Sequence, residues 1–143
     1  MKIRPLQEAD GAGVVALWES CGLLRAWNDP YKDINFAIKS PNSEILVGEV
    51  AGQIIVSVMV GHDGHRGAIY YLSVSPPYQK RGLGRAIHDA AAAWLRTQGV
   101  WKINLLVRSE NTQVLSFYDR LGYAPNRVVS LAKSLERGGT LEC

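Results

Sequence analysis

The spacing of apolar residues along the chain predicts four helices. Apolar side chains that recur every three or four positions give a helix one buried face. The longest such stripe consists of Leu83, Ile87, Ala90, Ala91, Trp94 and Leu95. The helices are expected at residues 11–21, 33–39, 83–98 and 111–121. Glycines follow three of them, and we expect Gly99 to close the third helix in the left-handed conformation.

Shorter runs rich in β-branched residues predict the strands. They are expected at residues 2–4, 43–50, 53–60, 69–74, 102–107 and 128–133. Ala51-Gly52 separates two of these runs and predicts a hairpin, and residues 62–67 predict a second turn. This order is typical of an α+β fold, with antiparallel hairpins first and helical crossovers later. No repeat or linker interrupts it, so we expect one domain over residues 1–143.

Composition and charge indicate an ordinary globular protein. Apolar residues make up 47% and charged residues 20% of the chain, which suits one domain with a buried core. Neither a membrane span nor a signal peptide is present in the sequence, so we expect a cytoplasmic location and no membrane partner. Cys21 and Cys143 suit neither a disulfide framework nor a metal site. The net charge of +3 and the absence of a wide basic face predict no nucleic-acid partner.

One turn concentrates positive charge and glycine between the strand at 69–74 and the helix that follows. It consists of Gln79, Lys80, Arg81, Gly82, Leu83, Gly84 and Arg85. A helix that begins there directs free N–H groups and the positive end of its dipole outward. Such a site binds anions, usually phosphate. The alternative is a plain strand-to-helix turn in which the glycines serve geometry only.

Two common phosphate-binding motifs do not fit this turn. A P-loop needs Gly-x-x-x-x-Gly-Lys followed by Ser or Thr, which the chain lacks. A dinucleotide fingerprint needs a small residue where this chain has Ile87, and no parallel βαβ unit begins the chain. The pattern that remains is Gln-x-x-Gly-x-Gly, at Gln79, Gly82 and Gly84.

This pattern resembles the acetyl-CoA motif of the GCN5-related N-acetyltransferase (GNAT) superfamily, and residues 72–85 carry the match. A second match lies downstream, at residues 110–111, 117–118 and 121–123. Two motifs in the right order and at the right spacing are more specific than one glycine turn, and the resemblance covers nearly all of the chain. Residues 24–30 and 64–71 further resemble the bacterial YpeA subgroup of the superfamily.

The resemblance implies a fold and a donor site. The fold is an α/β sandwich with a mixed sheet of about six to seven strands, splayed at the acetyl-CoA slot and flanked by about four helices. The pyrophosphate of coenzyme A would lie on the N–H groups of residues 80–85. Leu72, Ser73 and Val74 would bind the pantetheine arm as an added strand, and one of their N–H groups would polarise the thioester carbonyl. In the family, a bulge after this point splays two neighbouring strands.

Two residues of the second motif match family positions with roles in the donor reaction. Asn111 matches a residue that hydrogen-bonds the pantetheine. Because Asn is also a good helix N-cap, both roles can coexist. Tyr118 matches the tyrosine that protonates the departing thiolate, as the catalytic acid. The alternative for Tyr118 is a core aromatic beside Phe117.

The general base is absent from its usual family positions. Many relatives use a glutamate on one of the two central strands, where this chain has Ala68 and Leu106. Nearby candidates are Tyr70, Tyr71, Asp63, His62, His65, and Glu49 acting through a water. Each of these is also an ordinary turn or surface residue. An amine that arrives neutral and well positioned would need no such base.

The loop before the second helix is the expected acceptor wall, since the family builds that wall there. The candidate acceptor-binding residues are Arg25, Trp27, Asn28, Asp29, Tyr70 and Tyr71. The carboxylate of Asp29 would suit a cationic amine. Alternatively, Trp27 covers the core and Asn28-Asp29 caps the second helix before Pro30.

The resemblance implies an acetyl-CoA-dependent N-acetyltransferase. The acceptor would be a primary amine, either on a small molecule or at a peptide N-terminus or lysine, and it would attack the thioester directly in a ternary complex. No cysteine occupies a nucleophile position, so we expect no covalent acetyl-enzyme. The assembly would be a monomer or a homodimer. The alternative is a non-catalytic acyl-CoA sensor or regulatory module, which the missing glutamate favours.

Overall fold

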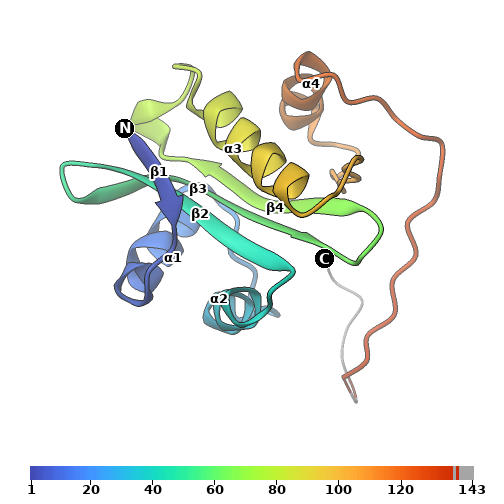
Figure 1. Ribbon diagram of the computed structural model, residues 1–143, viewed down its shortest axis with the longest axis horizontal. Coiled ribbons are helices and arrows are strands. Elements are labelled where there is room, and N and C mark those ends of the chain that lie inside the picture. Colours follow the sequence, from blue (N-terminus) through green and yellow to red (C-terminus); the bar gives the residue numbers. More distant parts are fainter. Residues whose placement is uncertain (137, 139–143) are drawn as a thin grey trace. The chain divides into compact units, whose positions relative to one another are not determined.

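The computed structural model describes residues 1–136 and 138, and most of the predicted elements are present in it (Figure 1). The elements of the described residues are β1 (Lys2–Pro5), α1 (Gly11–Ser20), α2 (Pro30–Lys39), β2 (Ser43–Val50), β3 (Gln53–His62), β4 (Gly67–Val74), α3 (Leu83–Thr97) and α4 (Thr112–Arg120). Short 3-10 helices span Glu8–Asp10 and Pro76–Tyr78. Cys143 lies outside the described residues.

The chain divides into two compact units. The first covers residues 1–105 and holds the sheet with α1, α2 and α3. The second covers residues 106–143 and holds α4. A single domain over residues 1–143 therefore stays a prediction.

The sheet of the first unit is antiparallel, in the order β1-β2-β3-β4. The predicted hairpin at Ala51-Gly52 joins β2 to β3 and is confirmed. Both turn residues have positive φ, 52° and 79°. A two-residue turn of this hand matches the twist of the strands that it connects.

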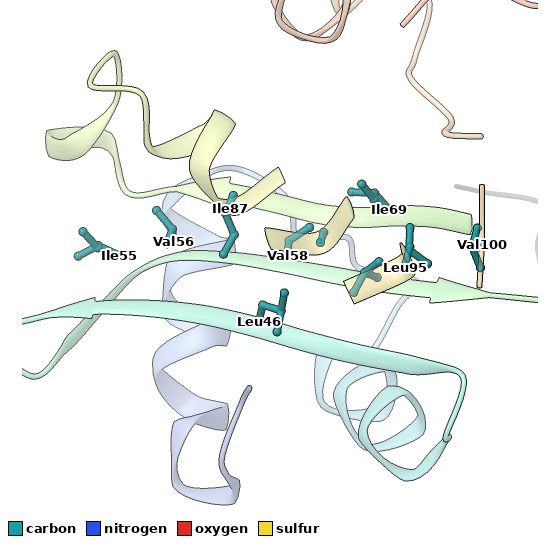
Figure 2. Close-up of a cluster of buried hydrophobic side chains, with 10 residues drawn as sticks. Leu46, Ile55, Val56, Val58, Ile69, Ile87, Leu95 and Val100 are labelled. Carbon is teal, nitrogen blue, oxygen red and sulfur yellow. The ribbon is translucent and has the colours of Figure 1, made fainter. Parts of the chain in front are cut away.

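Helices cover both faces of this sheet. In Figure 1, α3 lies on one face and α1 with α2 on the other. Figure 2 shows that Ile87 and Leu95 of α3 belong to one buried cluster with the sheet residues Val56, Val58 and Ile69. The predicted stripe of α3 is therefore confirmed as its buried face. On the opposite face, a second cluster is built from Val14, Leu17, Trp18, Ile34, Ala37, Ile45, Val47 and Ile54.

The predicted sheet of about six to seven strands is wrong, because the described residues form a sheet of four. The run at 102–107 contributes one parallel bridge, between Ile103 and Gly67, and no longer ladder. The run at 128–133 forms no strand, and its Val129 and Leu131 are 84% and 89% exposed. A run of β-branched residues becomes a strand only where a neighbouring strand pairs with it.

The buried pair Trp18 and Ser57 offers a test of the second cluster. Trp18 Nε1 donates to Ser57 Oγ at 2.9 Å, and both residues are fully buried. Trp18→Phe and Ser57→Ala should each lower the free energy of unfolding by about 1–3 kcal/mol, because each leaves a buried polar group without its partner. The double variant should cost less than the sum, which urea unfolding would measure. Additivity of the two costs would contradict this account.

Candidate active site

The turn before α3 has the backbone geometry of an anion site. Lys80 and Gly82 have φ of 64° and 83°, so the left-handed conformation occurs twice within three residues. In the part of the chain that the structure describes, the N–H groups of residues 80–84 donate to no backbone carbonyl. A turn of this kind gathers successive N–H groups toward one point, and α3 adds the positive end of its dipole.

Two cationic side chains extend from the same turn. Lys80 and Arg81 are exposed, and the Arg81 guanidinium lies 5.5 Å from the centre of the Tyr78 ring. The first turn of α3 contains no acidic residue. Cations at a helix N-terminus oppose the helix dipole, so this distribution of charge costs stability unless an anion lies between them. The electrostatics therefore favour a negatively charged ligand.

Gln79 has a structural role that its place in the motif did not indicate. Its side-chain Nε2 donates to the carbonyl of Val74 at 2.9 Å. This bond ties the turn to the end of β4, which stops at Val74 just before Pro76-Pro77 as predicted. The Gln79 side chain thus holds the turn in place, and contact with a cofactor stays a prediction.

One edge of β4 is open within the first unit. Gly67 N donates to Lys102 O and Asn104 N donates to Gly67 O, each at 2.9 Å. Beyond this bridge, residues 1–105 place no strand on that edge. An edge with unpaired N–H and C=O groups can accept an extended ligand as an added strand. Leu72–Val74 lie on this open edge.

A β-bulge interrupts β4. The register of the β3–β4 ladder shifts between Ser57 and Met59, so one residue of β3 faces two residues of β4. The additional residue is Tyr71, whose φ is 54°. We expected the bulge to follow Leu72–Val74, and the structure has it immediately before them. At the bulge, the side chain of Tyr71 contacts residues of α1, of α2 and of the loop between them.

The candidate side chains of the predicted acceptor loop differ in whether hydrogen bonds within the protein already engage them. Asp29 accepts hydrogen bonds from the N–H groups of the first turn of α2, so α2 begins at Pro30, earlier than predicted. Its carboxylate is thereby committed to capping. Arg25 donates to the carbonyls of Gly22 and Leu24. Trp27 is 46% exposed, so covering the core is not its whole role.

Asp33 is a residue of this region that the sequence did not single out. Its Oδ2 accepts from the Tyr71 hydroxyl at 2.7 Å and from Asn28 Nδ2 at 2.7 Å. Asn28 Nδ2 also lies 2.9 Å from the Tyr71 hydroxyl. The network joins the loop, α2 and β4, while the sequence places Asp33 and Tyr71 38 positions apart. No local pattern signals such a contact.

The second unit carries Asn111 at the N-cap of α4 and Tyr118 within α4. Asn111 Oδ1 accepts from Val114 N at 3.4 Å, so the capping role is present. The ring of Tyr118 packs edge-on against Phe117 and Tyr123, with centroids 5.1 and 5.3 Å away. Burial raises the pKa of Tyr118 to about 12, with a smaller contribution from Tyr123. The hydroxyl therefore carries its proton at neutral pH.

Comparison with known proteins decides the family. A model of the acetyltransferase (GNAT) family matches residues 13–123. The chain belongs to this family. A curated acetyltransferase of Sodalis glossinidius, SG1711, is 44% identical over 136 residues, covering 94% of this chain and 96% of the relative. Acetyltransferase YE1169 of Yersinia enterocolitica is 42% identical over 135 residues, with 94% and 96% covered.

Solved structures agree with this GNAT fold. The chain is similar to AAC(6')-Iy in complex with the bisubstrate analog CoA-S-monomethyl-acetylneamine, at TM-score 0.80 and 15% identity, covering 93% of this chain and 97% of that one. It is also similar to an acetyltransferase of Trypanosoma brucei, at TM-score 0.71 and 22% identity, with 92% and 99% covered. Membership of this family shows that the chain is an acetyltransferase, and so an enzyme rather than a non-catalytic sensor. The YpeA subgroup stays a prediction.

The candidate bases of this GNAT enzyme mostly have structural partners. Hydrogen bonds from the N–H groups of Arg66 and His65 hold the pKa of Asp63 below its ordinary value, which makes it a weak base. His62 Nδ1 accepts from Gly64 N at 3.0 Å. Glu49 Oε1 lies 3.6 Å from Arg4 Nη2, so the carboxylate is paired with a guanidinium. Ala68 and Leu106 bring no titratable group.

Among the described residues, no group of three or more His, Cys, Asp or Glu side chains could hold a metal ion. No helix there is both long enough and apolar enough to cross a membrane.

Proposed function

We propose that this acetyltransferase takes its acetyl group from acetyl-CoA and transfers it to a primary amine by direct attack in a ternary complex. The observation that carries the proposal is the turn at residues 79–85. It combines the N–H groups of residues 80–84, which donate to no backbone carbonyl in the described part of the chain, with two left-handed residues and the exposed cations Lys80 and Arg81. A pyrophosphate supplies the matching negative charge.

The residues of this turn fit the nucleotide end of coenzyme A. A side chain at Gly82 would need a left-handed backbone, and the space that a Cβ would fill is open. The pyrophosphate can therefore approach the backbone there. Lys80, Arg81 and Arg85 supply positive charge around it. AAC(6')-Iy, whose fold this chain shares, binds an analog containing coenzyme A, which supports the same use here.

The open edge of β4 suits the pantetheine arm. Leu72, Ser73 and Val74 follow the bulge and would offer backbone N–H and C=O groups to an extended chain, apart from the Val74 carbonyl, which already accepts from Gln79 Nε2. When bound, acetyl-CoA supplies a thioester whose carbonyl carbon an amine can attack. A backbone N–H of this edge would stabilise the negative charge that develops on the carbonyl oxygen.

For the second unit, the proposal keeps the roles that the family resemblance gives Tyr118 and Asn111. Tyr118 would give its hydroxyl proton to the sulfur as the carbon–sulfur bond breaks, and Asn111 would hydrogen-bond the pantetheine while capping α4. The amine would attack in its neutral form and then release its proton to solvent, and solvent would return a proton to the Tyr118 phenolate. The binding site for the acceptor amine would be formed by Arg25, Trp27, Asn28 and Tyr70.

A thiol-release assay over a panel of primary amines tests this proposal. The panel would contain polyamines, aminoglycosides, amino acids and peptides with free N-termini or lysines. We expect at least one class to accelerate release of coenzyme A above the rate with acetyl-CoA alone, with mass spectrometry detecting the acetylated amine. Binding of coenzyme A without acceleration by any class would count against transfer to an amine.

A further inference from the structure

Tyr71 has a backbone conformation that its side chain disfavours. Its φ of 54° lies in the left-handed region, where residues other than glycine are uncommon and bulky residues are rare. Such a conformation persists only where the surrounding structure holds it. The position is the bulge of β4, immediately before the open edge at Leu72–Val74.

Three elements hold the Tyr71 side chain. Its ring stacks on Trp18 of α1, with centroids 3.9 Å apart and planes 7° from parallel. Its hydroxyl donates to Asp33 Oδ2 of α2 at 2.7 Å and accepts from Asn28 Nδ2 of the preceding loop at 2.9 Å. Burial, with the nearby Asp33 carboxylate, raises the pKa of Tyr71, so the hydroxyl keeps the proton that it donates.

The bulge determines which face of the sheet the side chains of the following β4 residues occupy and which edge their backbone groups face. Leu72 and Val74 pack against the α3 side of the sheet, whereas Tyr71 packs with the cluster under α1 and α2. Side chains alternate along a strand, so loss of the additional residue would shift Leu72–Val74 by one position. The N–H and C=O groups on the open edge would then exchange places with those bonded to β3.

We propose that Asp33 is a positioning residue for the donor strand. Its carboxylate, acting through the Tyr71 hydroxyl, holds the bulge that sets which backbone groups of Leu72–Val74 face the open edge. The inference rests on the proposed function, in which the pantetheine arm lies along this edge. Asn28 belongs to the predicted acceptor loop, so the same network connects the acceptor side with the donor strand.

Binding of two ligands tests the role of Asp33 without knowledge of the acceptor. Acetyl-CoA carries the pantetheine arm, and adenosine 3′-phosphate 5′-diphosphate carries only the nucleotide half. By calorimetry, Tyr71→Phe and Asp33→Ala should each weaken acetyl-CoA binding about tenfold, the loss expected from one charge-assisted hydrogen bond. Both should bind the nucleotide half as the wild type does. The double variant should be no weaker than either single variant.

Two further variants separate positioning from charge and from general stability. Asp33→Asn keeps an oxygen that accepts from Tyr71, so it should retain acetyl-CoA affinity if Asp33 positions the bulge. Tyr31→Phe removes a hydroxyl from an exposed tyrosine of α2 and should change neither affinity. Tyr71→Phe keeps the ring on Trp18, so it carries the test if Asp33→Ala does not fold.

The outcomes distinguish the positioning role of Asp33 from the proposed function. Unchanged acetyl-CoA affinity in Tyr71→Phe would overturn the positioning role while leaving the proposed function intact, and so would equal weakening of both ligands. Loss of acetyl-CoA affinity in Asp33→Asn as large as in Asp33→Ala would assign the effect to charge and overturn it as well. A wild type that binds neither ligand would overturn the proposed function itself.

Discussion

Gly82→Val is expected to weaken acetyl-CoA binding about thirtyfold. Gly82 has a φ of 83°, and a β-branched residue forced into that conformation costs about 2 kcal/mol or distorts the turn. A turn that relaxes this strain displaces the N–H groups that start α3, so acetyl-CoA binding must restore the strained conformation at that cost. Calorimetric titration with acetyl-CoA measures the change in Kd directly.

A matched variant separates this local effect from backbone strain in general. Gly64 has a φ of 85° and equally open surroundings, and it lies in the turn at the other end of β4. Gly64→Val should lower the melting temperature as much as Gly82→Val does while leaving the Kd for acetyl-CoA unchanged. Equal loss of affinity in the two variants would mean that the turn at 79–85 has no special role in binding.

Tyr118→Phe is expected to lower kcat about a hundredfold, the smaller end of the usual range for a general acid. The KM for acetyl-CoA should hardly change, because phenylalanine keeps the ring packed between Phe117 and Tyr123. Steady-state kinetics with the amine identified by the thiol-release assay would measure both constants. An unchanged kcat would mean that the thiolate departs without a proton from this residue.

The pH dependence of kcat gives a second view of Tyr118. An acid must be protonated to act, so its contribution to the rate falls as pH rises through its pKa. Because burial raises that pKa to about 12, ionisation of Tyr118 should cause no fall in kcat below about pH 11. A falling limb near the ordinary tyrosine pKa of about 10 that disappears in Tyr118→Phe would contradict the buried environment.

Features that depend on local chemistry were predictable from the sequence. Ala51-Gly52 and Gly82 carry positive φ, and glycine at such positions is visible in the sequence. The stripe from Leu83 to Leu95 needs only a helical period to predict the buried face of α3. Likewise, Asp29 before Pro30 gives a helix start, although the prediction placed the start at Asp33.

Features that depend on distant partners were not predictable. The runs at 102–107 and 128–133 have strand composition, but pairing requires a neighbour that composition does not supply. Nothing in the sequence marks Tyr71 as a left-handed residue, since tyrosine rarely adopts that conformation. Its partner Asp33 is visible only once α2 lies against β4.

Calorimetric titration of the purified protein with acetyl-CoA tests most directly the proposal that the turn at residues 79–85 binds this cofactor. We predict saturable one-to-one binding with a Kd between about 1 μM and 1 mM, in the range of enzyme KM values. The affinity should fall as salt is added, because charge holds the pyrophosphate. Absence of saturable binding up to about 1 mM acetyl-CoA would contradict the account.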